Sequence, residues 1–524
     1  MPMLSVTLAS FLLALSPIVI VLALMVGARW SGTRSGFVGW CISLILAAGA
    51  FGAGPRLLWY SQLKSLLLSF FVLYIIWFAL ALFHVVNEAG ALRVISAGVA
   101  RLTSDRTMQL LILSWVFASF LQGVTGFGVP VAVVAPLLVG LGFPAMSSVV
   151  AASIGHAWAI TFGSIASSFY ALMAITGLDG HVLAPWTTFY LGIACLFSGL
   201  IPAYLYRGWS TLRHSLLAVS LIGGVMATVQ YLMAVHGLWS LASFTAGLVG
   251  LGVAAALARL PLYHGSASER SAGSQDNASP SMGLPAALSA YIVLLIVVVI
   301  AQLVPPFPDL LNRVRITMSF PETRTGLGWV NPAGPGRAIS VFGHAGALIL
   351  YTCIISFMLY RRWGCYEPGA AGRIIRRTVR GALRSSWAVL FLVGMAMAMA
   401  ESGMTYELAL GLSQAMGPVL PFIAPFIGMV GGFVTGTNTN SNVIFGPLQQ
   451  QTAQVLGHNV LIILAAQNVG GAVGSVISPA KVIVGCSTAG LAGREGEVMR
   501  LNLAYGVFIM AFMGALTAAL VALI

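Results

Sequence analysis

The feature that most restricts the fold of this chain is a succession of continuous apolar runs long enough to cross a bilayer. A transmembrane helix needs about 20 consecutive, mostly apolar residues, because the hydrocarbon core is about 30 Å thick. A membrane β-barrel would show short strands of period two instead. Since 59% of the residues are hydrophobic and only 7% are charged, we predict an all-α polytopic membrane protein. Residues 1–524 would form a single membrane domain.

We expect about 11–14 membrane segments, because two apolar runs lead directly into polar, glycine-rich stretches and need not cross fully. These two runs are 107–121 and 405–430. The predicted segments are 5–28, 36–53, 65–86, 107–121, 146–176, 185–205, 214–235, 237–260, 286–304, 338–360, 386–400, 405–430, 457–478 and 502–523.

The basic residues carry information about orientation. Arg29 and Arg34 follow the first apolar run, and no basic residue precedes it. This order predicts a retained first span in the cell inner (plasma) membrane with the N-terminus outside. The formal charge of +13 comes from short basic stretches between spans, so it indicates topology and contact with lipid headgroups rather than nucleic acid.

Three connecting segments differ from the apolar runs in composition. Segment 361–384 interleaves arginines with apolar residues, which predicts an amphipathic helix on the cytoplasmic surface. Segment 261–285 is rich in Ser, Gly and Pro, which predicts a flexible loop between two halves. Segment 305–337 is rich in Pro and Gly, and its composition assigns it no role.

One apolar region, Gly431–Pro479, contains the polar run TGTNTNSN. Such a stretch is tolerable at membrane depth only where it is buried in protein or lines a wet cavity. Open backbone and a helix N-terminus favour a small carboxylate, and Ser, Thr or Asn can bind a hydroxyl on the same molecule. The alternative is polar helix packing with close-approach glycines; for the whole cluster we favour a substrate site. Its candidate residues are Thr435, Gly436, Thr437, Asn438, Thr439, Ser441, Asn442 and Asn468.

The sequence also repeats itself weakly. Val124–Gly126 (VTG) recurs as Val434–Gly436, and three further matches follow in order at offsets that stay between 310 and 314. This pattern predicts two repeats, about 65–205 and 340–524, with broken helices at corresponding places and the substrate between them. The stretch after Phe120 fits a re-entrant turn or a kinked span equally well. Its candidate residues are Gln122, Thr125, Gly126 and Gly128.

Three ionisable residues are candidates for coupling or charge balance, because such groups are costly inside a membrane and often functional. His156 fits a proton relay, or a neutral histidine donating to a backbone carbonyl. Glu401 fits a relay or an interfacial position. Lys481 fits a counter-charge for an anion, or a side chain that extends to a headgroup.

The motifs of other function classes are missing from the sequence. It has no GxxxxGK[ST], HExxH or GxSxG, so we expect no nucleotide, no metal, no cofactor and no enzyme activity. The nearest rival to a transporter is a passive anion channel.

Four stretches carry a resemblance to a known family: Phe120–Phe143 (FLQGVTGFGVPVAVVAPLLVGLGF), Ser402–Leu410 (SGMTYELAL), Gly432–Gly457 and Asn468–Pro479. They are similar to the L-lactate permeases, over most of the chain. The resemblance implies proton-coupled uptake of lactate or a related 2-hydroxy monocarboxylate such as glycolate. It also implies the inverted repeats and re-entrant hairpins of a wider ion-transporter superfamily.

This chain departs from the family pattern at three positions. An acidic residue, an aspartate and a lysine usually stand where this sequence has Gln122, Asn438 and Ser475. An amide cannot carry a coupled proton as a carboxyl group can. The coupling ion, proton or sodium, and the particular small organic anion therefore stay open at this stage.

Overall fold

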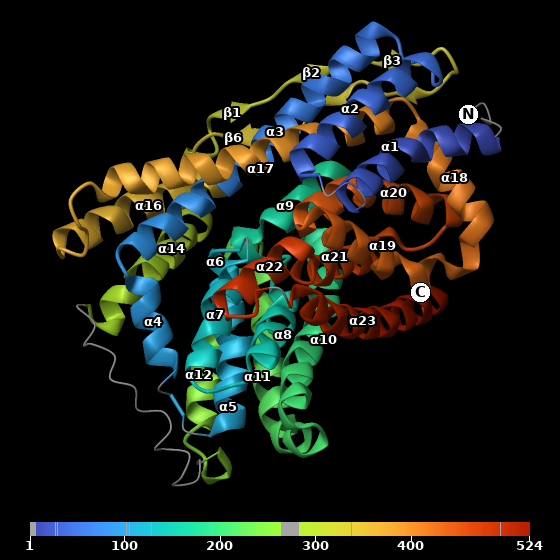
Figure 1. The fold of residues 1–524 in the computed structure, drawn as a ribbon. Coiled ribbons are helices and arrows are strands. Elements are labelled where there is room, and N and C mark those ends of the chain that lie inside the picture. Colours follow the sequence, from blue (N-terminus) through green and yellow to red (C-terminus); the bar gives the residue numbers. More distant parts are fainter. Residues whose placement is uncertain are drawn as a thin grey trace.

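The computed structural model describes residues 7–524 except 27, 29, 101, 104, 127, 264–281, 337 and 493. In this part of the chain, 12 helices are long and apolar enough to cross a membrane, or up to 13 if a pair bent by 51° is counted as one span. That pair is Ala145–Ala159 with Gly163–Thr176. The predicted fold class, a polytopic helical membrane protein, is confirmed (Figure 1).

The helices that precede residues 264–281 include one π-helical turn. They are α1 (Leu8–Val26), α2 (Gly32–Gly49), α3 (Pro55–Glu88), α4 (Ala91–Ala100), α5 (Arg106–Leu111), the π-helix η1 (Ile112–Phe117), α6 (Ala118–Val124), α7 (Val129–Gly140), α8 (Ala145–Gly155), η2 (Ala157–Ala159), α9 (Gly163–Thr176), α10 (Gly180–Arg207), α11 (Trp209–Val235), η3 (Trp239–Leu241), α12 (Ala242–Leu257) and η4 (Pro261–Tyr263). Most of the predicted loop 261–285 lies outside the described residues.

The helices after this segment contain the second polar stretch. They are α14 (Leu284–Leu303), α15 (Phe307–Leu311), α16 (Ala345–Arg362), α17 (Ala370–Glu401), α18 (Met404–Met416), η6 (Gly417–Val419), α19 (Leu420–Thr435), α20 (Asn438–Leu456), α21 (Val460–Val476), α22 (Pro479–Thr488) and α23 (Glu495–Leu523). The predicted run 405–430 is broken, because Gly417 and Pro418 separate α18 from α19.

The arginine-rich segment is not a separate helix. Arg361 and Arg362 end α16, and residues 370–384 form the first half of α17, which continues without a break through the predicted span 386–400. Arg376, Arg377 and Arg380 are exposed, and so are the apolar Ile375 and Val379 beside them. The exposed side of this half of α17 thus carries both arginines and apolar side chains, as a helix at a membrane surface would.

The helices α3 and α17 pack side by side and are joined by ion pairs at both ends. At one end Glu88 pairs with Arg373 and Arg377, and at the other Lys64 pairs with Glu401. Helix α3 rises about 36 Å between Lys64 and Glu88, at about 1.5 Å per residue. This length is close to the thickness of a bilayer's hydrocarbon core.

Segment 305–337, which the sequence left without a role, contributes most of a β-hairpin. Its strands are β1 (Arg315–Ile316), β2 (Ser319–Phe320), β3 (Thr323–Arg324), β4 (Val330–Asn331), β5 (Gly334–Pro335) and β6 (Ile339–Ser340). The antiparallel pairs β1–β6, β2–β5 and β3–β4 are nested, so together they form one long hairpin. At its tip, Gly326 N–H donates to the Gly52 carbonyl at 2.7 Å, and the hairpin lies along α3 and α2 (Figure 1).

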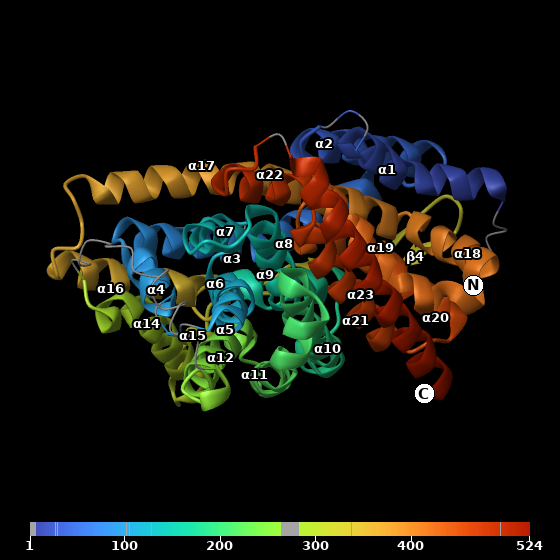
Figure 2. The same cartoon turned by 60° about the horizontal axis from the view of Figure 1, so that its bottom comes forward.

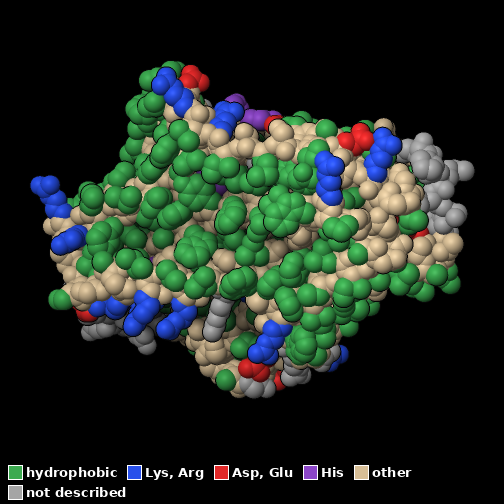
Figure 3. Space-filling model, turned by 90° about the horizontal axis from the view of Figure 1, so that it is seen from above, with side chains coloured by type: hydrophobic (Ala, Val, Ile, Leu, Met, Phe, Trp, Pro, Cys, Tyr) green, Lys and Arg blue, Asp and Glu red, His purple; other side chains and the backbone are tan. Residues whose placement is uncertain are grey.

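The outer surface is apolar over wide areas. In Figure 2, α17 lies across one side of the molecule with α1, α2 and α22 on the same side. Figure 3 shows hydrophobic side chains covering the middle of one face, with Lys and Arg mostly toward its edges. An apolar surface bordered by charge is what a bilayer requires of a protein that it surrounds.

Candidate functional site

The two VTG segments end their helices in the same way. The Thr125 hydroxyl donates to the Leu121 carbonyl at 2.7 Å, and the Thr435 hydroxyl donates to the Gly431 carbonyl at 2.7 Å. The next residue in each case, Gly126 or Gly436, has a φ of 66° or 75°. This left-handed conformation ends a helix and costs glycine little. Both segments are thus helix breaks of matching local geometry, while the inverted relation of two complete repeats stays a prediction.

A cluster of buried amides lies where α20 packs against α9 and α21. The Asn468 Oδ1 accepts from Asn438 Nδ2 at 2.9 Å and from Asn442 Nδ2 at 3.0 Å. It also accepts from the Thr161 hydroxyl at 3.2 Å. All four side chains are at most 1% exposed. One carbonyl oxygen therefore holds together groups from three separate segments of the chain.

This cluster, Asn438–Asn442–Asn468–Thr161, also contains polar atoms that are available to a ligand. Among the described residues, Asn438 Oδ1, Asn442 Oδ1 and Asn468 Nδ2 are buried and have no hydrogen-bond partner. A buried polar group without a partner costs about 1–3 kcal/mol, so each of these atoms would gain from a ligand of matching polarity. The cluster offers two acceptors and one amide donor.

Several other predicted residues of this stretch hold helices in place. Thr437 caps α20, because its hydroxyl accepts from Asn440 N–H at 3.1 Å. The hydroxyls of Thr439 and Ser168 hydrogen-bond at 3.2 Å, which joins α20 to α9. The Ser441 hydroxyl donates to the Gly428 carbonyl at 2.8 Å, which joins α20 to α19.

Lys481 lies between the two polar stretches. Its ammonium donates to the Ser475 hydroxyl at 3.1 Å. A methyl group added at Gly128, just after the first helix break, would lie 3.6 Å from Lys481 Cγ. The ammonium of Lys481 thus reaches Ser475, one of the three positions at which the resemblance implies a charged residue.

The first polar stretch contains a strained turn. Ser164, Ile165 and Ala166 at the start of α9 have φ of 49°, 56° and 61°. Non-glycine residues in this region store strain and keep the conformation only where packing enforces it. A methyl group at Gly126 would overlap the Ser164 hydroxyl. Gln122 lies close to this turn, because a methyl group at Gly163 would meet its side-chain amide. The Oε1 atom of Gln122 has no hydrogen-bond partner among the described residues.

The two relay candidates occupy different settings. His156 lies in the bend between α8 and η2 and is fully buried. Its Nδ1 lies 2.6 Å from the Ala152 carbonyl, which can only accept, so in the neutral imidazole Nδ1 carries the proton and Nε2 has the free lone pair. Glu401 instead ends α17 and forms the ion pair with Lys64.

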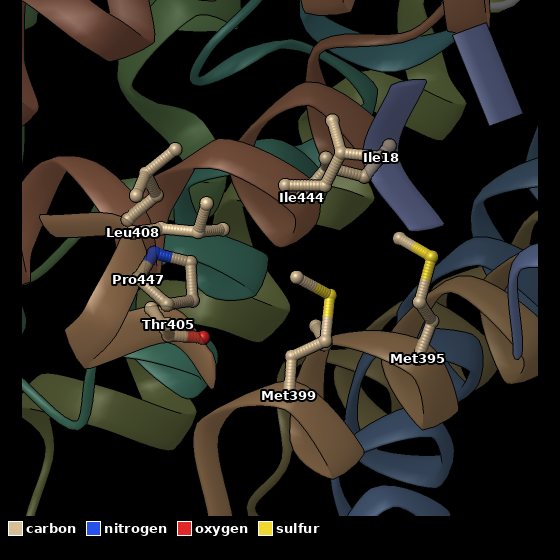
Figure 4. Close-up of a pocket in the computed structure, with 9 residues that line it drawn as sticks. Ile18, Met395, Met399, Thr405, Leu408, Ile444 and Pro447 are labelled. Carbon is tan, nitrogen blue, oxygen red and sulfur yellow. The ribbon is translucent and has the colours of Figure 1, made fainter. Parts of the chain in front are cut away.

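A small pocket on the opposite side of α20 is unsuitable for a substrate. It measures about 10 Å³, and Figure 4 shows Ile444 and Pro447 of α20 facing Met395 and Met399 of α17 across it. This volume is roughly that needed for one water molecule. The buried amide cluster is therefore the better candidate for the binding site.

Sequence reasoning missed several residues of this region. Thr161 joins the cluster, and Ser168 contacts Asn442, only because the fold brings α9 and the residues just before it beside α20; Thr161 and Asn438 are separated by 277 positions. Lys64 was overlooked although it is one of only two lysines in the chain. A lysine within an apolar run was the signal that could have identified it.

The fold and the site together define a class. Membrane segments that are broken at a glycine, with a buried cluster of polar side chains next to one of the breaks, are typical of secondary transporters. A family model described as L-lactate permease matches residues 10–524. The chain belongs to the L-lactate permease family, as the sequence predicted, and is a multi-pass membrane transporter.

The chain is similar to curated relatives over nearly its full length and theirs. The chain is 26% identical to the L-lactate permease of Bacillus subtilis, covering 96% of this chain and 94% of the relative. It is 27% identical to the glycolate permease of Escherichia coli, with 97% and 95% covered. It is 25% identical to the L-lactate permease of Escherichia coli, with 91% and 90% covered.

The chain also shares its fold with a solved structure. The YdaH transporter of Alcanivorax borkumensis, described as having an unusual topology, has a TM-score of 0.52 and 16% identity. The similarity covers 94% of this chain and 98% of that one. At this identity the similarity supports the fold alone.

Proposed function

We propose that the protein is a secondary active transporter that imports L-lactate or a closely related 2-hydroxy monocarboxylate, such as D-lactate or glycolate. It would act in the cell inner membrane with its N-terminus outside. The relatives are named L-lactate and glycolate permeases. The observation that carries the proposal is the buried Asn438–Asn442–Asn468–Thr161 cluster with its two acceptors and one donor.

This cluster fits both ends of a 2-hydroxy acid. The substrate's hydroxyl would donate to Asn438 Oδ1 or Asn442 Oδ1, which have no other partner in the described structure. Its carboxylate would accept from Asn468 Nδ2 and from the first N–H groups of α20, since the start of a helix has free N–H groups and a positive dipole end. Lys481 would supply the counter-charge. Because the cluster is buried, α9 and α20 would have to separate for the substrate to enter.

Proton coupling is the favoured mechanism. One proton moving with one monocarboxylate is electroneutral, so a pH gradient could drive uptake against an inside-negative potential. The His156 Nε2 atom is buried and has no hydrogen-bond partner among the described residues. Its lone pair is suited to accept that proton. Glu401 is the second candidate for the relay. Sodium coupling and a passive channel are the alternatives.

Uptake into proteoliposomes tests this function. With an acidic exterior, the protein should accumulate radiolabelled L-lactate and glycolate above the external concentration, and a sodium gradient alone should not do so. Accumulation driven only by a sodium gradient would mean that sodium, and not the proton, is the coupling ion. Equilibration without accumulation under either gradient would indicate a channel, and no uptake of any 2-hydroxy acid would refute the proposal.

Replacing His156 by Gln should separate binding from coupling. The glutamine amide can still donate to the Ala152 carbonyl but cannot take up a proton. We expect lactate to raise the Tm of the H156Q protein as it does that of the wild type. We also expect accumulation driven by a pH gradient to fall about 10-fold or more, as when a proton-transfer group is lost. Wild-type accumulation by H156Q would exclude His156 from the relay.

A further inference from the structure

A second candidate binding region lies at one end of α3, away from the buried amides. It is a cavity of about 550 Å³ between α3, the end of α9, the β-hairpin and α17. This is within the range of about 300–1,000 Å³ that small-molecule sites have. Among the described residues that line it, Lys64 is the only one with a charged side chain.

Two partners, Glu401 and Phe320, contact the ammonium of Lys64 in this cavity. The ammonium donates to both carboxylate oxygens of Glu401, at 2.9 and 2.8 Å, and lies 5.4 Å from the centre of the Phe320 ring. The side chain of Lys64 is 21% exposed and that of Glu401 is 12% exposed. The pair is thus enclosed enough for a strong interaction but still open to an incoming ion.

The β-hairpin fixes the position of Glu401. Asn331 of β4 donates to the Glu401 backbone carbonyl at 2.8 Å. The Trp329 ring lies against the Tyr406 ring, with centroids 5.1 Å apart. Because Phe320 comes from the same hairpin, the hairpin contacts both partners of the ion pair. It also lines the cavity through Pro335 and Gly336.

The cavity adjoins the helix that leads to the amide cluster. Its lining includes Ala174–Gly177 at the end of α9. Ser168 lies on the same helix about 9 Å nearer its start, at about 1.5 Å per residue, and its backbone carbonyl accepts from Asn442 Nδ2 at 3.1 Å. Gln450 of α20 donates to the Thr176 carbonyl at 3.1 Å. The α9–α20 contact therefore separates the cavity from the cluster.

We propose that Lys64 is a second carboxylate-binding residue of the transporter. It would bind the monocarboxylate in this cavity before the substrate reaches the amide cluster, and the substrate's carboxylate would replace Glu401 on the ammonium. The end of α9 carries the negative end of a helix dipole, which repels an anion, so a cation is needed there. The exchange keeps one carboxylate on Lys64 throughout. This inference rests on the proposed function.

Two substitutions that break the same ion pair should have opposite effects. Lys64→Met removes the binding cation and should raise the KM for lactate uptake about 10-fold, the effect of losing a charge-assisted hydrogen bond. Glu401→Gln frees the cation from its competitor and should lower the KM about 3-fold. Lys64→Arg keeps the charge and should stay close to the wild type in KM.

Controls distinguish this role from a structural one. Glu88→Gln disrupts the ion pair at the other end of α3, and it should leave the KM unchanged. If Lys64→Met and Glu401→Gln shift the KM in the same direction, or if the double variant K64E/E401K restores the wild-type KM, the ion pair is structural and the inference is wrong.

A separate measurement tests anion binding at Lys64 if the proposed transport function is wrong. If the wild type takes up no 2-hydroxy acid, the same variants are compared by the Tm shift that each member of a monocarboxylate panel produces. Loss of the shift in Lys64→Met and an increase in Glu401→Gln would still support anion binding at Lys64. Equal shifts in both variants would refute it.

Discussion

Replacing Asn468 by alanine is expected to abolish lactate uptake and the stabilisation of the protein by lactate. Asn468 Oδ1 is the common acceptor for Asn438, Asn442 and Thr161, so the substitution removes three hydrogen bonds and one candidate substrate donor. Side-chain hydrogen bonds inside membrane proteins contribute only about 0.6 kcal/mol each on average. The total of about 2 kcal/mol is small enough for the protein to stay folded. The loss of function should therefore exceed the loss of stability.

Uptake into proteoliposomes, together with the Tm in the presence and absence of lactate, measures both quantities. Asn502→Leu is a matched control, because Asn502 on α23 is also fully buried but neither of its amide atoms has a partner among the described residues. That variant should transport lactate normally. If Asn468→Ala keeps the wild-type KM and the lactate-dependent Tm shift, the amide cluster is not the binding site.

The parts of this site that the sequence could predict are those that local chemistry decides. A VTG segment followed by polar residues predicts a helix break, since threonine can bond its own backbone and glycine accepts a positive φ. Both breaks, at Gly126 and Gly436, are in the structure. The polar run from Thr435 was expected to be buried in protein or to line a wet cavity, and Asn438, Ser441 and Asn442 are buried.

The remainder depends on contacts between distant positions. Lys64 and Glu401 are separated by 337 positions, and no local pattern pairs them. The continuity of α17 was missed for another reason: hydropathy falls where the arginines begin, yet arginine is a good helix former, so the helix continues past the apolar run. The hairpin was missed because each of its strands is only two residues long.

A methyl group at Gly474 is expected to destabilise the whole protein. It would overlap the Met429 carbonyl on α19, and one at Gly428 would overlap the Gln467 carbonyl on α21. Each helix thus presents glycine to the backbone of the other. Overpacking costs about 1–3 kcal/mol, occasionally more, and here the obstacle is backbone that no side-chain rotation can relieve. We expect the larger values for Gly474→Ala.

Thermal unfolding of the purified protein in detergent measures this loss as a fall in Tm, with Gly252→Ala as the control. Gly252 also lies inside a helix, α12, but an added methyl group meets nothing within 4 Å there. That substitution should be neutral or stabilising by up to about 1 kcal/mol, because alanine is the better helix former. Equal Tm values for both variants would mean that the backbones of α19 and α21 are not in contact.

The distance between α19 and α21 matters for function, since α19 ends at the break before Asn438 and α21 carries Asn468. Close backbone contact between the two helices is therefore what brings these two amides within hydrogen-bonding distance.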